Sequence, residues 1–287
     1  MFELTVLGTS SAMPTPERSL SCIAVRKDGN TFLLDCGEGS QRQMMRFGVS
    51  YMKVRAIFIT HLHLDHFLGV FGLLETLRLN GRKEKLTIYA PQGAPGVFGK
   101  KEFLEVKEID AKWSEDFGGF TVSSFATKHA GTSFGFCFQE KEKVRFHEEK
   151  AKGLGLKGPM FTEIQKKGKL TVNGKVVKLK DVTYTSPGKK IVFSGDSAPC
   201  ATLARAAKAA DLLIHESTFG SDKLKEAKET SHSTAEDAAN CAKKAGAKKL
   251  LLTHFSGRYA NTAPLVAEAK KIFPSIEAAK DGTKLEV

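Results

Sequence analysis

Long apolar runs are absent from this chain of 287 residues: no stretch of about 18 consecutive apolar residues occurs. We therefore expect no membrane-spanning helix. The first residues, MFELTVLGTSS, also lack the basic segment followed by an apolar stretch that marks a signal peptide. Together these absences predict a soluble protein of the cytoplasm. Hydrophobic residues still make up 41% of the chain, which is enough for a sizeable core and excludes general disorder.

Cysteine pairs at metal-binding or redox spacing are also missing. The five cysteines are widely spread and include no C-x-x-C pair: Cys22, Cys36, Cys137, Cys200 and Cys241. An odd number at irregular spacing argues against a disulfide framework and against a thiolate zinc cluster. We expect buried, reduced thiols instead.

Acidic residues are the minority charge, with 32 Asp and Glu against 44 Lys and Arg and a formal net charge of +12. The basic excess is concentrated in one segment, because residues 141–190 hold 14 Lys and Arg against 5 Asp and Glu. Such a segment suits a polyanionic partner such as a nucleic acid. An exposed lysine-rich surface without a partner has the same composition.

Short apolar segments bounded by turn residues recur along the chain and predict strands. These segments span residues 2–8, 30–39, 54–61, 85–91, 120–129, 190–196, 211–216 and 248–254. Apolar side chains at three- and four-residue spacing predict helices from residue 65 onward and over 201–210, 234–245 and 262–272. Strands that alternate with helices indicate an α/β protein, and no linker-like segment divides the chain. We therefore expect a single domain over 1–287.

One segment, from about residue 142 to residue 187, departs from this alternation. It is rich in glycine and lysine and has few apparent apolar anchors. We interpret it as an inserted arm that projects from the domain and is mobile. A lysine-rich hairpin on the main body is the alternative.

Four potential metal ligands lie within six residues, directly after the apolar run AIFI: His61, His63, Asp65 and His66. Imidazole and carboxylate are good ligands for zinc and similar divalent metals. Alternation at a strand end can bring His61 and His63 towards one point, and the turn into a helix can bring Asp65 and His66 beside them. The spacing predicts a metal site rather than scattered surface histidines.

Three further ligand-type residues end other predicted strands, namely His129, Asp196 and His254. In α/β sheets, sites gather beyond the carboxyl ends of the strands, so these residues are expected at one shared site. Seven ligands are too many for one tetrahedral zinc but suit two metals that share a carboxylate. The residues alone therefore predict a dinuclear metal centre.

The stretch from Thr60 to Gly69 reads T-H-x-H-x-D-H-x-x-G and is similar to the signature of the metallo-β-lactamase superfamily. Further motifs resemble those of the ribonuclease Z family in its order: LLDCGEGSQRQ (33–43), SGDS (194–197), HEST (215–218), SHST (231–234) and LTHFSGRY (252–259). The resemblance covers nearly the whole chain. It implies the metallo-β-lactamase fold, an α/β αββα four-layer sandwich with two mixed sheets, here with a protruding basic arm.

The same resemblance implies a zinc-dependent endoribonuclease that removes the 3′ trailer from precursor tRNA. The cut would leave a 3′-hydroxyl on the tRNA and a 5′-phosphate on the trailer. Two Zn²⁺ per subunit are implied, although other divalent metals suit the same ligands.

The resemblance also distributes the ligands. One metal would be bound by His61, His63, His129 and Asp196, and the other by Asp65, His66, Asp196 and His254, with Asp196 bridging. Asp65 would additionally orient or deprotonate the attacking water. Asp35, in the LDCGEG stretch, would orient a ligand imidazole; a turn carboxylate without that role is the alternative.

The resemblance also implies which residues transfer a proton, one in the HEST motif and one in the SHST motif. His232 would donate a proton to the leaving oxygen, and Glu216 would hold and polarise its ring. A carboxylate that is hydrogen-bonded to an imidazole favours the protonated ring. Alternatively, His232 only precedes a helix that Ser233 or Thr234 caps.

The basic segment has a counterpart in the family, an arm that grips the elbow of the tRNA. The residues expected to bind RNA are Lys157, Gly158, Pro159, Lys166, Lys167 and Lys169. Lysines there would neutralise phosphates without reading sequence. In the family the arm serves the active site of the partner subunit, which implies a homodimer with the arm acting in trans.

Two positions depart from the family pattern. Leu64 stands where glycine is usual after the second histidine of the motif, and Ser19 stands where asparagine is common in the loop at residues 13–21. In the family this loop lies near the 3′ end of the tRNA. The departures concern fine specificity, including CCA-bearing tRNA, and leave every metal ligand in place.

Three other functions compete with this interpretation. A relative could act on small phosphodiesters, sulfate esters or lactones, but a small substrate needs no distant phosphate grip. A nucleic-acid-binding protein without catalysis would not need all seven ligands together with Glu216 and His232. A redox di-iron protein would more often have a carboxylate where this chain has histidine.

His215 and His147 are interpreted as structural or surface residues.

Overall fold

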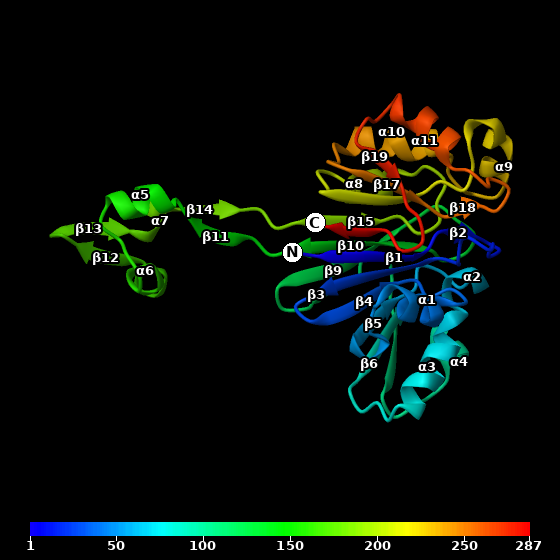
Figure 1. Cartoon of the computed structure of the whole chain (residues 1–287), viewed down its shortest axis with the longest axis horizontal. Coiled ribbons are helices and arrows are strands. Elements are labelled where there is room, and N and C mark those ends of the chain that lie inside the picture. Colours follow the sequence, from blue (N-terminus) through cyan, green and yellow to red (C-terminus); the bar gives the residue numbers. More distant parts are fainter. The chain divides into compact units, whose positions relative to one another are not determined.

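The computed structural model describes all 287 residues, which form two compact units (Figure 1). The larger unit comprises Met1–Gln139 and Lys189–Val287, and the smaller unit is Glu140–Gly188. The smaller unit covers the part of the chain in which basic residues are concentrated. No helix has the length and apolar character needed to cross a membrane.

The first sheet of the larger unit has seven strands in the order β20-β1-β3-β4-β5-β6-β7. Their bounds are β20 (Lys284–Glu286), β1 (Glu3–Gly8), β3 (Cys22–Lys27), β4 (Asn30–Leu34), β5 (Val54–Phe58), β6 (Leu86–Ala90) and β7 (Leu104–Glu108). The first four strands in this order pair antiparallel, and β4 to β7 pair parallel. The sheet is therefore mixed.

The second sheet also has seven strands, in the order β19-β17-β16-β15-β10-β9-β8. Their bounds are β19 (Ile276–Ala278), β17 (Leu250–Thr253), β16 (Leu212–Glu216), β15 (Lys190–Phe193), β10 (Phe134–Glu140), β9 (Phe120–Ala126) and β8 (Ser114–Asp116). The strands from β19 to β15 are parallel, whereas β15–β10 and β8–β9 are antiparallel. A short pair, β2 (Ser10–Ser11) with β18 (Phe255–Ser256), lies outside both sheets.

Helices cover the outer face of each sheet (Figure 1). On the first sheet these are α1 (Ser40–Phe47), α3 (Gly69–Leu79) and α4 (Ala94–Phe98); on the second they are α8 (Ala201–Ala206), α10 (Ala235–Ala245) and α11 (Ala263–Lys270). Alternation along β5 shows how the layers form: Phe58 packs between the sheets, and Ile57 packs under the helices. The predicted αββα sandwich with two mixed sheets is confirmed.

All eight predicted strands form, as β1, β4, β5, β6, β9, β15, β16 and β17. The helix predicted from residue 65 is interrupted at Leu68, which separates α2 (Leu64–Phe67) from α3. The remaining elements of the larger unit are η1 (Tyr51–Lys53), η2 (Ser221–Lys223) and α9 (Leu224–Glu229).

The smaller unit contains two antiparallel strand pairs and three short helices. The pairs are β11 (Lys143–Phe146) with β14 (Thr183–Ser186), and β12 (Lys169–Val172) with β13 (Lys175–Lys178); the helices are α5 (Glu148–Gly153), α6 (Met160–Lys167) and α7 (Leu179–Val182). Six apolar residues form its own core: Ala151, Leu156, Ile164, Val172, Val177 and Val182. The expectation of few apolar anchors is therefore wrong, because single apolar residues between lysines come together only once the helices and strands form.

Candidate active site

The ligand run that follows β5 folds back on itself. His61 lies just beyond the strand, His63 precedes α2, and Asp65 and His66 lie within that helix. The ring of His61 has its centroid 4.4 Å from that of His63 and 4.1 Å from that of His66. The turn from strand to helix therefore brings these imidazoles together, as the spacing predicted.

Two glycines make this turn fit against the neighbouring LDCGEG loop. A side chain at Gly69 would meet the Gly37 carbonyl oxygen at 2.0 Å, and one at Gly37 would meet the Asp65 carbonyl oxygen at 2.3 Å. The loops are also joined by hydrogen bonds, from Cys36 N to His66 O at 2.7 Å and from Gly69 N to Cys36 O at 3.0 Å. Only residues without a side chain permit this approach, so the motif ends in glycine.

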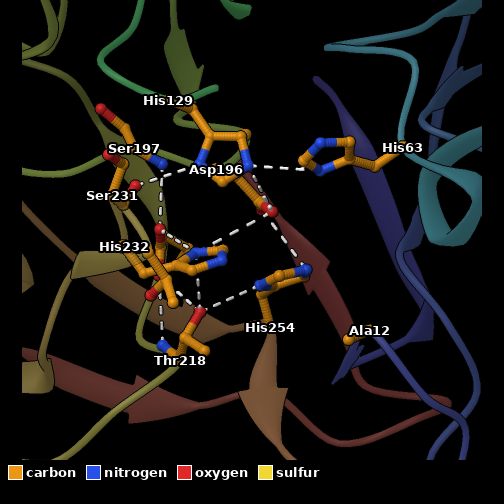
Figure 2. A network of polar contacts seen from close by, with 12 residues as sticks. Ala12, His63, His129, Asp196, Ser197, Thr218, Ser231, His232 and His254 are labelled. Carbon is orange, nitrogen blue, oxygen red and sulfur yellow. Dashed lines mark hydrogen bonds and ion pairs between the residues drawn. The ribbon is translucent and has the colours of Figure 1, made fainter. Parts of the chain in front are cut away.

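Asp196 lies at the centre of the cluster and faces ligands from both sheets (Figure 2). Its Oδ2 is 3.3 Å from His66 Nε2, 3.8 Å from His61 Nε2 and 3.9 Å from His129 Nε2. Its Oδ1 is 3.3 Å from His254 Nε2. A single carboxylate with ligands on two sides is the arrangement that a shared, bridging ligand requires.

The remaining predicted ligands complete the two sides. His129 Nε2 lies 3.3 Å from His63 Nδ1, and Asp65 Oδ2 lies 3.5 Å from His66 Nε2 and 3.6 Å from His254 Nε2. Three sets of potential ligand atoms each lie within 4.8 Å of one another: His61, His63 and His129; His61, His66 and Asp196; and Asp65, His66 and His254. The structure thus brings all seven predicted ligands to one place.

The buried nitrogens of this cluster show that the residues fit a metal. The Nε2 atoms of His61, His66 and His254 are buried without any hydrogen-bond partner. A buried polar atom without a partner is costly, and a divalent cation satisfies imidazole nitrogens and carboxylate oxygens together. Burial, together with the charge of His66, lowers the pKa of His61 to about 2, so this ring is neutral as ligation requires.

Hydrogen bonds to Nδ1 orient the ligand imidazoles. Asp35 is fully buried, and its Oδ2 accepts from His66 Nδ1 at 2.7 Å, while its Oδ1 accepts from Thr60 N at 2.9 Å. His129 Nδ1 donates to the carbonyl oxygen of Ser231 at 3.0 Å. Both contacts leave Nε2 free to face the cluster.

Strained backbone conformations gather around the same cluster. Seven residues other than glycine have positive φ, and four of them border the site: Ala12, Asp35, Ser231 and His254. Each costs conformational energy that the surrounding contacts must offset. Ala12, for example, donates its backbone N–H to Asp65 Oδ2 at 2.9 Å.

Glu216 and His232 form a second pair beside the ligands. Glu216 Oε1 lies 2.9 Å from His232 Nδ1, and Ser197 N donates to the same oxygen at 2.9 Å. Burial disfavours the charged ring, but the carboxylate of Glu216 outweighs this and raises the pKa of His232 to about 9. Glu216 therefore favours the protonated form of His232, and it engages the Nδ1 of that ring.

Thr218 connects this pair to the metal ligands (Figure 2). Its hydroxyl donates to Glu216 Oε2 at 2.7 Å and lies 3.1 Å from His254 Nδ1, from which it accepts. His232 Nδ1 is 3.9 Å from Asp196 Oδ2, and the rings of His232 and His129 have centroids 4.8 Å apart. The imidazole held by Glu216 thus lies directly beside the candidate metal centre.

Comparison with known proteins agrees with this geometry. A family model described as "Beta-lactamase superfamily domain" matches residues 164–255, and one described as "Anti-Pycsar protein Apyc1" matches residues 2–96. Ribonuclease Z of Methanosarcina acetivorans is 39% identical over 300 residues, which cover 100% of this chain and 98% of the relative. The chain belongs to the ribonuclease Z family.

Solved structures extend the comparison. Human tRNase Z, short form, superposes with a TM-score of 0.70 and 29% identity over 99% of both chains. The metallo-β-lactamase fold protein YhfI from Bacillus subtilis has a TM-score of 0.76 and 21% identity over 100% of this chain and 99% of its own. As a ribonuclease Z family member, the chain is an endoribonuclease with the metallo-β-lactamase fold.

The predicted RNA-binding residues of this family member lie in its smaller unit. Gly158 has a φ of 49° and precedes Pro159, the N-cap residue of α6, and Lys166 and Lys167 end that helix. Lys157 lies just before α6 and Lys169 just after it. All six of these residues are exposed. The structure brings them together on one small unit.

The structure also shows where His215, His147 and Leu64 lie. His215 is buried and its Nδ1 donates to the carbonyl oxygen of Glu216 at 2.7 Å, while the ring of His147 packs against Tyr184 in the smaller unit. Neither joins the metal cluster. Leu64 is 62% exposed, so its side chain points outward rather than filling the space between the ligands.

The sequence patterns do not reveal every residue of this site. Thr218 stands in the HEST motif two positions after Glu216, where a hydroxyl beside a carboxylate could have signalled a contact. Ser231 and Ala12 act through backbone atoms, for which residue type gives no signal. Ser197 also acts through its backbone N–H.

Proposed function

We propose that this protein removes the 3′ trailer from precursor tRNA by metal-dependent hydrolysis of one phosphodiester bond. The observation that carries the proposal is the contact of His232 with Glu216 at 2.9 Å, directly beside a cluster of seven side chains that can bind metal. Membership of the ribonuclease Z family supplies the substrate class. The products are a 3′-hydroxyl on the tRNA and a 5′-phosphate on the trailer.

The proposed cofactor is two Zn²⁺ per subunit, although other divalent metals suit the same donors. Two sets of ligands would hold them: His61, His63, His129 and Asp196, and Asp65, His66, Asp196 and His254. When bound, such cations lower the pKa of water and stabilise negative charge on the oxygens of a displaced phosphodiester.

Four side chains have proposed roles besides holding the metal. Asp65 contributes a ligand oxygen and orients the attacking water, and its own orientation is fixed by the hydrogen bond from Ala12 N. As the bond between phosphorus and the 3′ oxygen of the tRNA breaks, His232 donates a proton to that oxygen. Glu216 keeps the ring protonated and fixes its direction, and Asp35 holds His66 in its ligating tautomer.

The proposed RNA grip lies in the smaller unit and consists of Lys157, Gly158, Pro159, Lys166, Lys167 and Lys169. Exposed lysines bind phosphates without reading the base sequence, so they contribute affinity and position. The arm is proposed to act on the active site of a second copy, which makes the working protein a homodimer. The proposed location is the cytoplasm, which suits a tRNA substrate.

Cleavage of an end-labelled precursor tRNA by the zinc-loaded protein tests the proposal, with Asp65→Ala as the comparison. We expect one main cut after the discriminator base and a loss of about 10³-fold or more in Asp65→Ala, since ligand and water orientation are removed together. Retained hydrolysis of a small chromogenic phosphodiester without any cut in tRNA would reassign the site to small substrates.

A further inference from the structure

A carboxylate outside the metal cluster ties together three segments that border it. Asp281 lies in the turn between β19 and β20 and is partly buried. Its Oδ1 accepts a hydrogen bond from Thr9 Oγ1 at 2.8 Å. Its Oδ2 accepts from Ser19 N at 2.7 Å and from Gln43 Nε2 at 2.9 Å. Asp281 is therefore a shared acceptor for the end of β1, the loop at residues 12–21 and helix α1.

The loop at residues 12–21 is fixed at its other end by a candidate metal ligand. Ala12 N donates to Asp65 Oδ2 at 2.9 Å, while Ser10 N donates to Ser19 O at 2.9 Å and closes the base of the loop. Between these points the loop faces solvent, and Met13 is 71% exposed. A substrate that reaches Asp65 therefore meets this loop as the rim of the site.

The three donors depend on Asp281 to different extents. Gln43 Nε2 also donates to Leu7 O at 2.8 Å, so α1 has a second tether. Ser19 N has Asp281 as its acceptor, and Thr9 is fully buried, so its hydroxyl would be left without one. Loss of the carboxylate consequently loosens the loop at Ser19 more than it loosens the helix, while Arg18 Nη2 still donates to Tyr259 O at 2.7 Å.

We propose that Asp281 is a positioning residue that holds the 12–21 loop where it sets which phosphodiester bond of the RNA meets the metal centre. The inference rests on the proposed function. A displacement of about 1 Å at a reacting bond can cost about 100-fold in rate, so a loosened rim reduces both rate and accuracy. A small phosphodiester does not extend along the loop, so its hydrolysis should depend on Asp281 far less than RNA cleavage does.

The variant Asp281→Asn tests this, because it keeps the shape of the side chain and removes one acceptor oxygen and the charge. Asp211→Asn is the matched control. Asp211 also binds three donors, Lys248 Nζ at 2.8 Å, Lys190 N at 2.9 Å and Lys189 Nζ at 3.3 Å. It precedes β16, whereas Glu216 ends that strand, so it lies away from the site.

We expect Asp281→Asn to lower kcat/KM on precursor tRNA by about tenfold or more, in line with the loss of buried hydrogen bonds. New RNA ends should appear at neighbouring phosphodiester bonds. Metal content should match that of the parent protein, and hydrolysis of a small chromogenic phosphodiester should fall far less than cleavage of precursor tRNA. Hydrogen exchange should accelerate in the peptide that covers residues 12–21. Asp211→Asn should change neither the RNA ends nor that exchange.

Unchanged exchange in residues 12–21 of Asp281→Asn would overturn the anchoring, whatever the substrate. The positioning role would be overturned by a different result. In that case Asp281→Asn would show faster exchange in residues 12–21 but would cut the RNA at the same position as the parent protein, with a rate loss no larger than that of Asp211→Asn. If the parent protein cuts no precursor tRNA, the proposed function fails, whereas the exchange result still judges the anchoring. Should Asp281→Asn fold poorly, Ser19→Pro leaves Asp281 in place, removes the N–H of residue 19 that it accepts, and must reproduce the altered cut position.

Discussion

The charge on a single imidazole, that of His232, depends on one neighbouring carboxylate. His232 can donate a proton only while it is protonated, so activity should fall as pH rises through its pKa. Glu216 raises that pKa. Glu216→Gln removes the charge and lowers the pKa, and the alkaline limb of the kcat–pH profile should therefore move to lower pH. Profiles of both proteins in the same metal-loaded state check this.

Glu229→Gln is the control for this substitution, because Glu229 ends α9 on the exposed surface and its profile should match that of the parent protein. Bound cations lower the pKa of His232 equally in all the proteins compared. Superimposable alkaline limbs for Glu216→Gln and the parent would contradict the role of His232 as the proton donor.

At the scale of residues, side-chain chemistry was more predictable than backbone chemistry. His61, His63, Asp65 and His66 follow one strand closely enough that any turn brings them together. His129, Asp196 and His254 could be added because each ends a strand, and strand ends share an edge. The contacts of Ser231 and Ala12 use main-chain atoms in left-handed conformations, which the identity of the residue does not encode.

At the scale of elements, the smaller unit can be removed to separate RNA binding from chemistry. β11 and β14 pair antiparallel and place Val144 opposite Thr185, so a deletion of residues 145–182 joins chain ends that are already close. We expect a loss of about 10²-fold or more in kcat/KM on precursor tRNA, because several phosphate contacts disappear. Hydrolysis of a small phosphodiester should stay within about twofold. Equal losses on both substrates would count against a distant RNA grip.

Mixing two inactive variants tests whether this element acts in trans. The deletion protein retains the metal ligands but no arm, and Asp65→Ala retains the arm but lacks a ligand. If each arm serves its partner's site, an equimolar mixture recovers up to about one quarter of the parent rate on precursor tRNA, because random pairing makes about half of the dimers mixed and each has one working site. No recovery, with exchange of subunits confirmed by size, would show that the arm serves its own subunit.

Elements were predictable where their apolar pattern was dense. β5, β6 and β17 are almost entirely buried and read as continuous apolar runs. β7, β8 and β20 escape prediction because they are short or half exposed, and so carry charged residues. The core of the smaller unit was not predicted for a related reason. Residues such as Ile164 and Val177 lie among mostly polar residues in the sequence and contact other apolar side chains only in the folded unit.

For the whole molecule, the metal should act as a stabiliser of one unit. Bound cations would satisfy the three buried Nε2 atoms that otherwise have no partner. Removing metal by chelation should therefore lower the unfolding free energy of the larger unit, by about 3 kcal/mol if the metal had been present at about 100 times its Kd. Hydrogen exchange of the two units, with and without chelator, measures this separately for each.

Exchange in Glu140–Gly188 should be unchanged by the chelator, because its core contains no residue of the metal cluster. Restoring zinc should return the larger unit to its original protection. A larger unit that is equally protected in both states would contradict a structural contribution from the metal.

The first sheet has a consequence for how the protein emerges from the ribosome. β1 pairs with β20, and Phe2 and Val287 exchange two backbone hydrogen bonds of 3.0 Å across that pair. β1 is therefore synthesised long before its partner β20. Until β20 is made, the edge of β1 is unpaired and can pair with the wrong strand. His254 and Asp281 also arrive late. A nascent chain consequently carries no complete cluster of metal ligands until His254 has been synthesised and β17 has joined its sheet.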